Sequence, residues 1–350
     1  MAGDFVWEDA GRTVLFHRNG LDRAAALIQS RGLVPFALFS TPRALAAAPE
    51  LAATAATVYE VGEGEVPDLA ADLLPQNPDR WADLGSEASQ IGPSAASIVA
   101  LGGGRVIDAA KAVASVTGAN VTAIPTTMSG AEMTAIHRLP AGAESRVLGM
   151  VRPRLVIADP AAMTSQPEAQ LRASSMNALA HGADSLYTPF ANPVSVMTAL
   201  RGAELIATAL GQDPKSRDRA ALALGSLLCG YAIDSAKFGL HHVICQTLVR
   251  VCGSPHAQTN ATILPRAVSF LAARAPAAFT PLATALGTDL QNLESRLLAL
   301  AGSPVGLGLL GADESKLDGA IEAMLQRTEL AYVPTPPLRQ DLAQLLAAAW

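Results

Sequence analysis

Histidines able to do chemistry are concentrated in one part of this 350-residue sequence. Four of the six lie between positions 181 and 256: His181, the adjacent pair His241 and His242, and His256. Their surroundings are mostly Ala, Leu and Gly, where an unpaired polar group is expensive to bury. A neutral imidazole carries one donor and one acceptor, and either nitrogen can bind a metal. The cluster therefore indicates a polar site, although one or two of these residues could be core histidines bonded to the backbone.

Asn177 extends this cluster. It precedes His181 by four residues, so on a helix the two side chains share a face. Three imidazoles can bind zinc or ferrous iron and leave a position for substrate. Asn177 would be a neutral and poor fourth ligand, so the residues alone leave a metal site and a metal-free proton-transfer site both open.

A second candidate site lies earlier in the chain, at two junctions between a predicted strand and the segment after it. Gly102, Gly103 and Gly104 follow an apolar run and open a helical segment. Consecutive glycines let the backbone approach a phosphate, and a helix start can hold the anion. The pattern is neither G-x-G-x-x-G nor a Walker A loop, and a plain tight turn is the alternative. Thr126 and Thr127 follow the next strand, at the same sheet edge, which favours a nucleotide.

The elements that must position these residues divide into two parts. Up to about residue 160, short apolar runs alternate with helical segments, as in βαβ units with a mostly parallel sheet. After that point only helical patterns follow. We therefore predict an α/β dinucleotide-binding domain over 1–160 and an all-helical domain over 161–350. The expected strands are 34–39, 57–61, 97–101, 120–124 and 155–158; the expected helices are 21–30, 66–74, 167–187, 194–210, 217–236, 240–252, 257–273, 289–301, 314–325 and one after 334–337.

Composition limits the class of protein. The chain is 50% hydrophobic and 16% charged, which excludes a disordered protein. Its net charge of -6 and lack of a basic run argue against a nucleic-acid partner. Three cysteines give no disulfide framework, and we find neither a signal peptide nor an apolar run that would span a membrane. A soluble cytoplasmic protein with no membrane partner is expected.

Taken together, the motifs resemble the group III, iron-containing alcohol dehydrogenase family, which shares its fold with dehydroquinate synthase. Within it, the chain is most similar to the maleylacetate reductase branch. The resemblance covers nearly the whole chain. Its motifs are Phe5-Val-Trp-Glu8, Ser40-Thr41-Pro42, the triple glycine with Asp108 and Lys111, Pro125-Thr126-Thr127, Glu132-Met-Thr134, Met176 to His181, Gly239 to His242, and Pro255-His256.

The resemblance implies a cofactor, a partner and a set of cofactor-binding residues. The cofactor would be NADH or NADPH, and the chain would form a homodimer that acts on a small carboxylate substrate. The triple glycine and the two threonines would contact the pyrophosphate and the nicotinamide ribose. The residues expected at the cofactor are Ser40, Thr41, Gly102, Gly103, Gly104, Asp108, Thr126 and Thr127.

The implied reaction is hydride transfer from NAD(P)H to the carbon–carbon double bond of maleylacetate, giving 3-oxoadipate, a step of aromatic degradation or a related pathway. Imidazoles near the developing enolate would stabilise its charge and supply a proton. The catalytic candidates are Asn177, His181, His241, His242 and His256. Metal-dependent relatives place Asp where this chain has Asn177, so no metal is expected. If a metal is bound, its ligands would be His181, His242 and His256.

Two departures from the family pattern keep other functions open. Arg105 stands where the family has Ser after the glycines, and Gln246 stands where the branch has a further histidine. An amide cannot titrate, so Gln246 cannot replace a proton donor. One alternative is a metal-dependent alcohol dehydrogenase or aldehyde reductase of the same fold. The other is a lyase, a cyclase or a binding protein that has lost redox chemistry.

Overall fold

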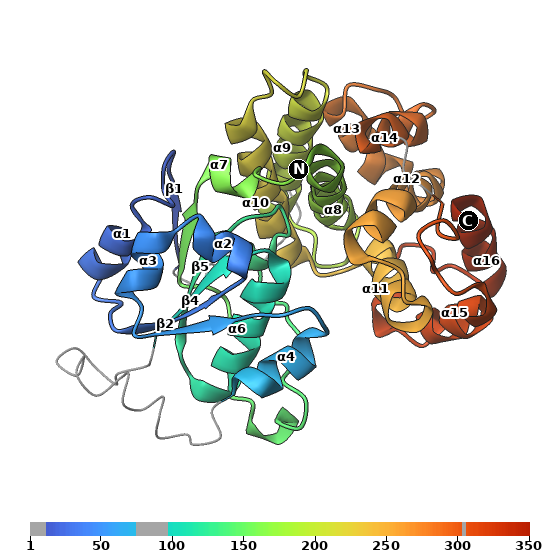
Figure 1. Ribbon diagram of the computed structural model, residues 1–350. Helices are drawn as coiled ribbons and strands as arrows, with labels where there is room; N and C mark the ends of the chain where they lie inside the picture. The colour runs from blue at the N-terminus through green and yellow to red at the C-terminus, as the bar shows by residue number, and fades with distance from the viewer. Residues whose placement is uncertain (1–11, 75–96, 303–305) are drawn as a thin grey trace. The chain divides into compact units, whose positions relative to one another are not determined.

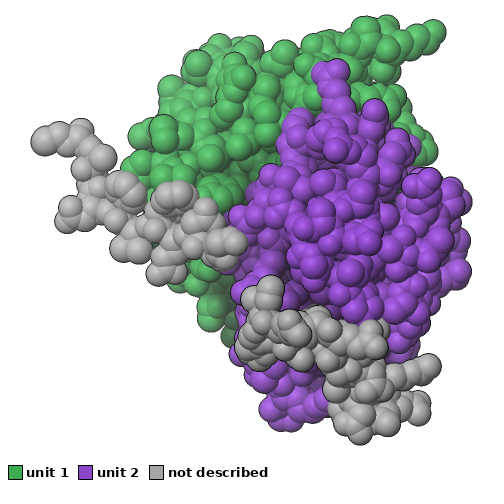
Figure 2. Space-filling model, turned by 90° about the vertical axis from the view of Figure 1, so that its left-hand side faces the viewer, with its two compact units in different colours: residues 1–8, 166–350 green, residues 9–165 purple. Residues whose placement is uncertain are grey.

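The computed structural model describes residues 12–74, 97–302 and 306–350 (Figure 1). The segment Phe5-Val-Trp-Glu8, which contributes to the family resemblance, lies outside the described residues. The chain separates into two compact units that divide between Ser165 and Gln166, close to the predicted boundary at residue 160 (Figure 2).

A six-stranded parallel sheet forms the centre of the first unit, in the order β1-β6-β5-β4-β2-β3. The predicted strands are all present, with ends shifted by at most two residues, and β1 was not foreseen. Its four residues, Thr13 to Phe16, alternate between half-buried and exposed, and the apolar run within them, 14–16, is too short to mark a strand. The strands are β1 (Thr13–Phe16), β2 (Phe36–Ser40), β3 (Thr57–Glu60), β4 (Ser97–Gly102), β5 (Asn120–Pro125) and β6 (Leu155–Ala158).

Helices cover both faces of this sheet because successive strand residues point to opposite sides. On one face, Phe39 and Ile98 pack against α4 (Val66–Leu73) and α6 (Gly104–Thr117). On the other face, Phe36 and Val99 pack against the shorter helices α1 (Ala24–Ser30), α2 (Pro42–Ala46) and α3 (Pro49–Thr54). Helices α2 and α3 were not predicted; each is at most six residues long, too short for a helical periodicity to be visible.

The strand order reverses between β2 and β4. From β4 the chain adds β5 and then β6 on one side, where β1 forms the edge, and β2 and β3 lie on the other side. In register, Ser40 pairs with Leu101, and Gly102 pairs with Pro125, so the carboxyl ends of β2, β4 and β5 are neighbours. Such a reversal leaves a crevice beyond the strand ends, where doubly wound sheets bind ligands.

The second unit contains only helices, as predicted, in the part of it that the structure describes. Helix α11 has the bounds that the sequence predicts, whereas α13 was not foreseen. No helix among the described residues is long and apolar enough to cross a membrane. After α7 (Pro160–Met163), the helices are α8 (Glu168–Asp184), α9 (Pro193–Leu210), α10 (Arg219–Ala236), α11 (Leu240–Cys252), α12 (His256–Arg274), α13 (Pro276–Ala285), α14 (Leu293–Ala301), α15 (Leu317–Leu325) and α16 (Arg339–Ala349).

Helix α8 is central to this unit, since it packs against α9, α10, α11 and α12. Its neighbours α9 and α10 approach closely at two glycines. A Cβ at Gly202 would lie 2.7 Å from the carbonyl oxygen of Gly225, so only glycine allows this contact. The consequence is a tight scaffold of helices around α8, which carries Asn177 and His181.

Candidate active site

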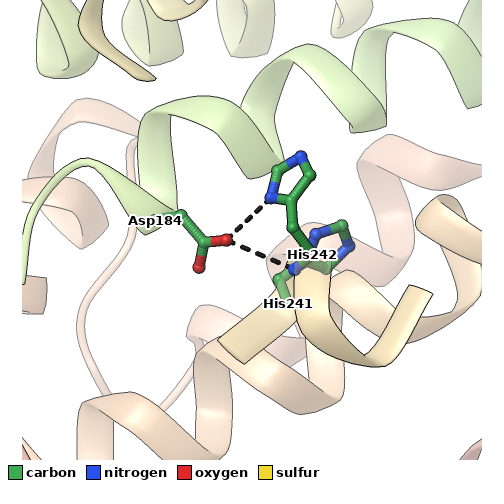
Figure 3. A group of neighbouring side chains, drawn as sticks. All are labelled: Asp184, His241 and His242. Atoms are coloured by element: carbon green, nitrogen blue, oxygen red, sulfur yellow. Dashed lines mark hydrogen bonds and ion pairs between the residues drawn. The ribbon is translucent and has the colours of Figure 1, made fainter. Parts of the chain in front are cut away.

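One carboxylate fixes the histidine cluster, and it belongs to a residue that the sequence analysis did not single out. Asp184 is the last residue of α8 and is fully buried. Its Oδ2 accepts a hydrogen bond from Nδ1 of His242 at 2.7 Å (Figure 3) and another from the backbone N–H of Gly239 at 3.0 Å. Burial alone would raise the pKa of Asp184, but the hydrogen bond and the charge of His242 outweigh it and bring the pKa to about 2.

The same carboxylate anchors the start of α11. Tyr187 donates its hydroxyl hydrogen to Oδ1 of Asp184 at 2.5 Å and accepts the backbone N–H of Leu240 at 2.6 Å. These contacts satisfy amide groups that a helix start leaves without intrahelical partners. Gly239 is required here, since a Cβ at this position would lie 2.0 Å from the Tyr187 hydroxyl oxygen. The glycine of the Gly-Leu-His-His motif therefore allows the start of α11 to pack closely against the residues at the end of α8.

The ring of His242 has a defined orientation and a free nitrogen. Because Nδ1 faces a carboxylate, it carries the proton, and Nε2 is left as an acceptor. Nε2 is buried and has no hydrogen-bond partner among the described residues. The ring stacks on His181 with centroids 4.8 Å apart and on Phe238 with centroids 4.5 Å apart. Burial, together with the neighbouring His242 and His241, lowers the pKa of His181 well below its usual value, so this ring is neutral at pH 7.

His241 points to another neighbour. Its ring lies edge-on to His242, with centroids 5.0 Å apart, and its Nε2 lies 3.3 Å from the carbonyl oxygen of Asn260 on α12. Cys245 Sγ is 3.4 Å from the same nitrogen. Burial, with the charge of His242 next, lowers the pKa of His241 to about 3. His241 is therefore a neutral ring beside the site that also joins α11 to α12.

The other two predicted catalytic residues are less closely placed. His256 begins α12 and is exposed, although its charge still acts on the pKa of both His181 and His241. Asn177 is buried on α8, one turn before His181. The structure thus brings His181, His241 and His242 into ring contact. The catalytic roles of all five candidates stay predictions.

The described side chains include possible metal ligands, but the arrangement of the His181 and His242 rings opposes an ion shared by both. Asp184, His241 and His242 are the described group whose possible ligand atoms lie within 4.8 Å of one another. However, Asp184 already uses Oδ2 to accept the His242 proton. The rings of His181 and His242 are parallel to within 8°, so their in-plane lone pairs cannot converge on one ion. An ion bound by both His181 and His242 would require at least one of these rings to turn.

Gln246, one turn after His242, has a structural partner. Its side-chain oxygen accepts a hydrogen bond from Nη2 of Arg327 at 3.1 Å. In the related branch this position carries a further histidine. Here Gln246 occupies it and orients the guanidinium group of Arg327. No local sequence pattern predicts this contact, because 81 residues separate the pair.

In the first unit, the triple glycine lies where β4 ends and α6 begins. Helix α6 begins at Gly104, and no described side chain caps its N-terminus. A Cβ at Gly103 would lie 3.0 Å from Thr127, and one at Gly104 would lie 2.8 Å from Ser129. Thr126 donates its backbone N–H to the carbonyl oxygen of Gly102 at 2.9 Å, which ties the two turns together. The first amides of a helix, the helix dipole and a backbone without side chains are features that suit the pyrophosphate of a dinucleotide.

The remaining predicted cofactor residues flank this turn, and their roles are untested. Ser40 is buried and donates its hydroxyl hydrogen to the carbonyl oxygen of Leu101 at 2.8 Å. Thr41 caps α2 through its side chain. Asp108 lies on the second turn of α6 and pairs with Lys111 at 2.8 Å. Arg105 is exposed on the first turn.

Lys111 and Glu132 are two fully buried ionisable residues near the glycine turn that the sequence analysis did not identify as a pair. Lys111 is fully buried, and its Nζ donates to the carbonyl oxygens of Ala131 and Ile136 at 2.9 and 2.8 Å. Glu132 is also fully buried, and burial raises its pKa to about 7, against the opposing effects of its own backbone, Lys111 and Ser129. Lys111 therefore holds the segment after Thr127 and Ser129 in place beneath the glycine turn.

Comparison with known proteins assigns both units to one family. The family model for iron-containing alcohol dehydrogenase matches residues 12–160, and the model for the C-terminal part of the Fe-containing alcohol dehydrogenase family matches residues 172–350.

Individual relatives agree with this match. Maleylacetate reductase 1 of Rhodococcus opacus is 35% identical over 263 residues, which make up 72% of each chain. Maleylacetate reductase of Burkholderia cepacia is 32% identical and covers 98% of this chain and 96% of its own. The crystal structure of maleylacetate reductase from Agrobacterium tumefaciens has a TM-score of 0.83 at 28% identity, over 99% of this chain and 98% of that one.

Proposed function

The chain belongs to the iron-containing alcohol dehydrogenase family and is an NAD(P)-dependent oxidoreductase, and we propose that it reduces the carbon–carbon double bond of maleylacetate or a closely similar unsaturated keto dicarboxylate. The relatives named maleylacetate reductase support this substrate class. The observation that carries the proposal is the buried pair of Asp184 and His242, in which Nε2 of His242 has no hydrogen-bond partner among the described residues.

The cofactor site of this proposal is the turn at Gly102, Gly103 and Gly104, where α6 begins. The first amides of α6 would bind the pyrophosphate, and Thr126 and Thr127 would contact it from the next strand end. The bound nicotinamide supplies the hydride. The protein contributes the position of the phosphates, which the close packing of Gly103 and Gly104 against Thr127 and Ser129 makes rigid.

The proton would come from His242. Reduction of maleylacetate places a hydride on the alkene carbon β to the ketone, which leaves an enolate that must gain a proton at the α carbon. Protonated His242 would deliver this proton from Nε2, while Asp184 keeps Nδ1–H in place and stabilises the positive ring beforehand. The net reaction consumes NAD(P)H and one proton and gives 3-oxoadipate and NAD(P)+.

We further propose that the enzyme works without a metal. Asn177 supplies no anionic ligand, Asp184 is committed to His242, and the parallel rings of His181 and His242 do not converge on an ion. The alternative, a metal-dependent alcohol dehydrogenase or aldehyde reductase, is favoured by one observation, namely the donor atoms of Asp184, His241 and His242 within 4.8 Å of one another.

The test is an assay of the purified protein with NADH and NADPH, maleylacetate, and a panel of simple aldehydes and alcohols. We expect maleylacetate to oxidise either cofactor with 3-oxoadipate as product, and full activity after dialysis against a chelator. Stoichiometric iron or zinc, with activity lost on chelation and restored by that metal, would instead establish the alternative.

A further inference from the structure

Arg327 carries a guanidinium group that is fixed on two sides and unpaired on the third. It lies just before the 3-10 helix Thr328–Tyr332. Its Nε and Nη2 donate to the Glu329 carboxylate at 3.1 and 2.5 Å, and Nη2 also donates to the side-chain oxygen of Gln246 at 3.1 Å. Its Nη1 is buried and has no hydrogen-bond partner among the described residues. A buried donor left unpaired destabilises the folded protein, so such a group calls for a ligand.

Helix α11 relates this guanidinium group to the reacting histidine. Gln246 follows His242 by four residues, so their side chains leave the same face of α11, with Cβ atoms roughly 5–6 Å apart. The hydrogen bond between Gln246 and Arg327 therefore links the guanidinium group to the turn of α11 that follows His242, and each of the two side chains has a buried nitrogen atom without a hydrogen-bond partner among the described residues. Nε2 of His242 can exchange a proton, and Nη1 of Arg327 can only donate hydrogen bonds.

A small carboxylate matches this pair of groups. A guanidinium group binds carboxylates directionally through its planar N–H groups, and it stays charged at every working pH. We propose that Arg327 binds one carboxylate of the substrate through Nη1, with Gln246 as the residue that positions it beside His242. This assignment rests on the proposed function, because it supplies that function with a receptor for one end of a dicarboxylate.

Glu329 sets the strength of this receptor. Its carboxylate pairs with Nε and Nη2, and the hydrogen bonds from Arg327 lower its pKa, so it is ionised at neutral pH. The negative charge holds the guanidinium plane still, but it also opposes a second carboxylate nearby. Two substitutions should therefore act in opposite directions: loss of Arg327 weakens substrate binding, and loss of the charge of Glu329 strengthens it.

The experiment measures KM for maleylacetate in the wild type, Arg327→Gln, Arg327→Lys and Glu329→Gln. Arg201→Gln is the matched control, since it removes an exposed Arg–Glu pair on α9. A hydrogen bond to a charged group is worth about 1.5–3 kcal/mol, so Arg327→Gln should raise KM by roughly 10- to 100-fold. The KM of Arg327→Lys should lie between those of the wild type and Arg327→Gln. Glu329→Gln should have a lower KM than the wild type, and the control Arg201→Gln should have the same KM.

Substrates that lack one carboxylate identify the group that is bound. We would compare two analogues of maleylacetate. The first, 4-oxopent-2-enoate, lacks the carboxylate on the ketone side, and the second, 3-oxopent-4-enoate, lacks the carboxylate on the alkene. The effect of Arg327→Gln should persist with one of them and disappear with the other. An unchanged KM in both Arg327 variants, or a rise in KM with Glu329→Gln, would overturn the assignment.

Calorimetric binding of adipate, an unreactive dicarboxylate, separates this inference from the proposed function. If the wild type fails to reduce maleylacetate, the proposed reaction is wrong. Adipate binding that Arg327→Gln weakens by roughly tenfold would still establish a carboxylate receptor. Equal adipate binding by Arg327→Gln and Arg201→Gln would refute the receptor even in an active reductase.

Discussion

Oδ2 of Asp184 accepts both the ring Nδ1–H of His242, at 2.7 Å, and the backbone N–H of the same residue, at 3.3 Å. One oxygen atom at the end of α8 thus fixes the position of the His242 backbone and the direction of its ring. The ring cannot turn without breaking a charge-assisted hydrogen bond in a buried place. This relationship makes His242 the histidine of the cluster with the best defined proton-transfer geometry.

Asp184→Asn should lower kcat by roughly 10- to 100-fold, a part of the 10²–10⁴-fold that a positioned acid–base group contributes. The amide keeps the shape of the side chain but removes the charge that stabilises a protonated His242. Steady-state kinetics would measure this, with the KM for NAD(P)H expected to stay close to that of the wild type. A variant with unchanged kcat would show that Asp184 only anchors α11.

His242→Ala should lower kcat by roughly 10²–10⁴-fold and leave cofactor binding nearly intact. The reason is that His242 lies in the helical unit, whereas the proposed phosphate site is the glycine turn of the sheet unit. Fluorescence titration with NADH or NADPH measures the binding. His17→Ala is a suitable control, because His17 is exposed and belongs to the other unit. An equal loss of binding and turnover would contradict the assigned role.

Lys237→Gly should stabilise the protein. Lys237 has φ 67° and ψ 170° between α10 and α11, a backbone region that essentially only glycine occupies at low energy. Such strain costs about 1–3 kcal/mol, and glycine would relieve it. Glycine also destabilises the folded protein by roughly 0.5–1 kcal/mol, because its unfolded chain has more conformational freedom to lose. We expect a net gain of about 1 kcal/mol in chemical denaturation. Lys237→Ala, which keeps the strain, should show no gain, and equal behaviour of both variants would refute the strain.

Glu132→Gln should abolish a decrease in the free energy of unfolding that the wild type shows as the pH rises. The folded pKa of Glu132 is about 7 against the ordinary 4.5, so the folded state keeps a proton that the unfolded state releases. The free energy of unfolding of the wild type therefore falls as the pH rises from 4.5 to 7, and then levels off. One pKa unit corresponds to about 1.4 kcal/mol, so this contribution is about 3 kcal/mol. Urea denaturation of both proteins at pH 5 and pH 8 measures it.

The expected result is a difference between the two proteins that grows in favour of Glu132→Gln from pH 5 to pH 8. Both proteins share every other titrating group, so the comparison isolates this carboxyl. A difference that does not change with pH would mean that Glu132 is ionised in the folded protein throughout.

Much of the architecture was readable from the sequence. Alternating short apolar runs and helical segments predicted the parallel sheet, and the helical patterns after residue 160 predicted the second unit. These signals are local, since hydrophobic periodicity and helix-ending residues such as proline and glycine depend only on positions close together in the sequence. The strand β1 and the short helices α2 and α3 were missed because they are too brief or too exposed to produce such a signal.

The sequence alone also determined which residue types could act: the imidazoles of His181, His241 and His242, and the glycine turn before α6. Only the tertiary structure decided which partners they have. Asp184 meets His242 across 58 residues, and Arg327 meets Gln246 across 81. A buried carboxylate or guanidinium group gains its role from the groups that desolvate and pair with it, and that environment exists only after distant segments pack together.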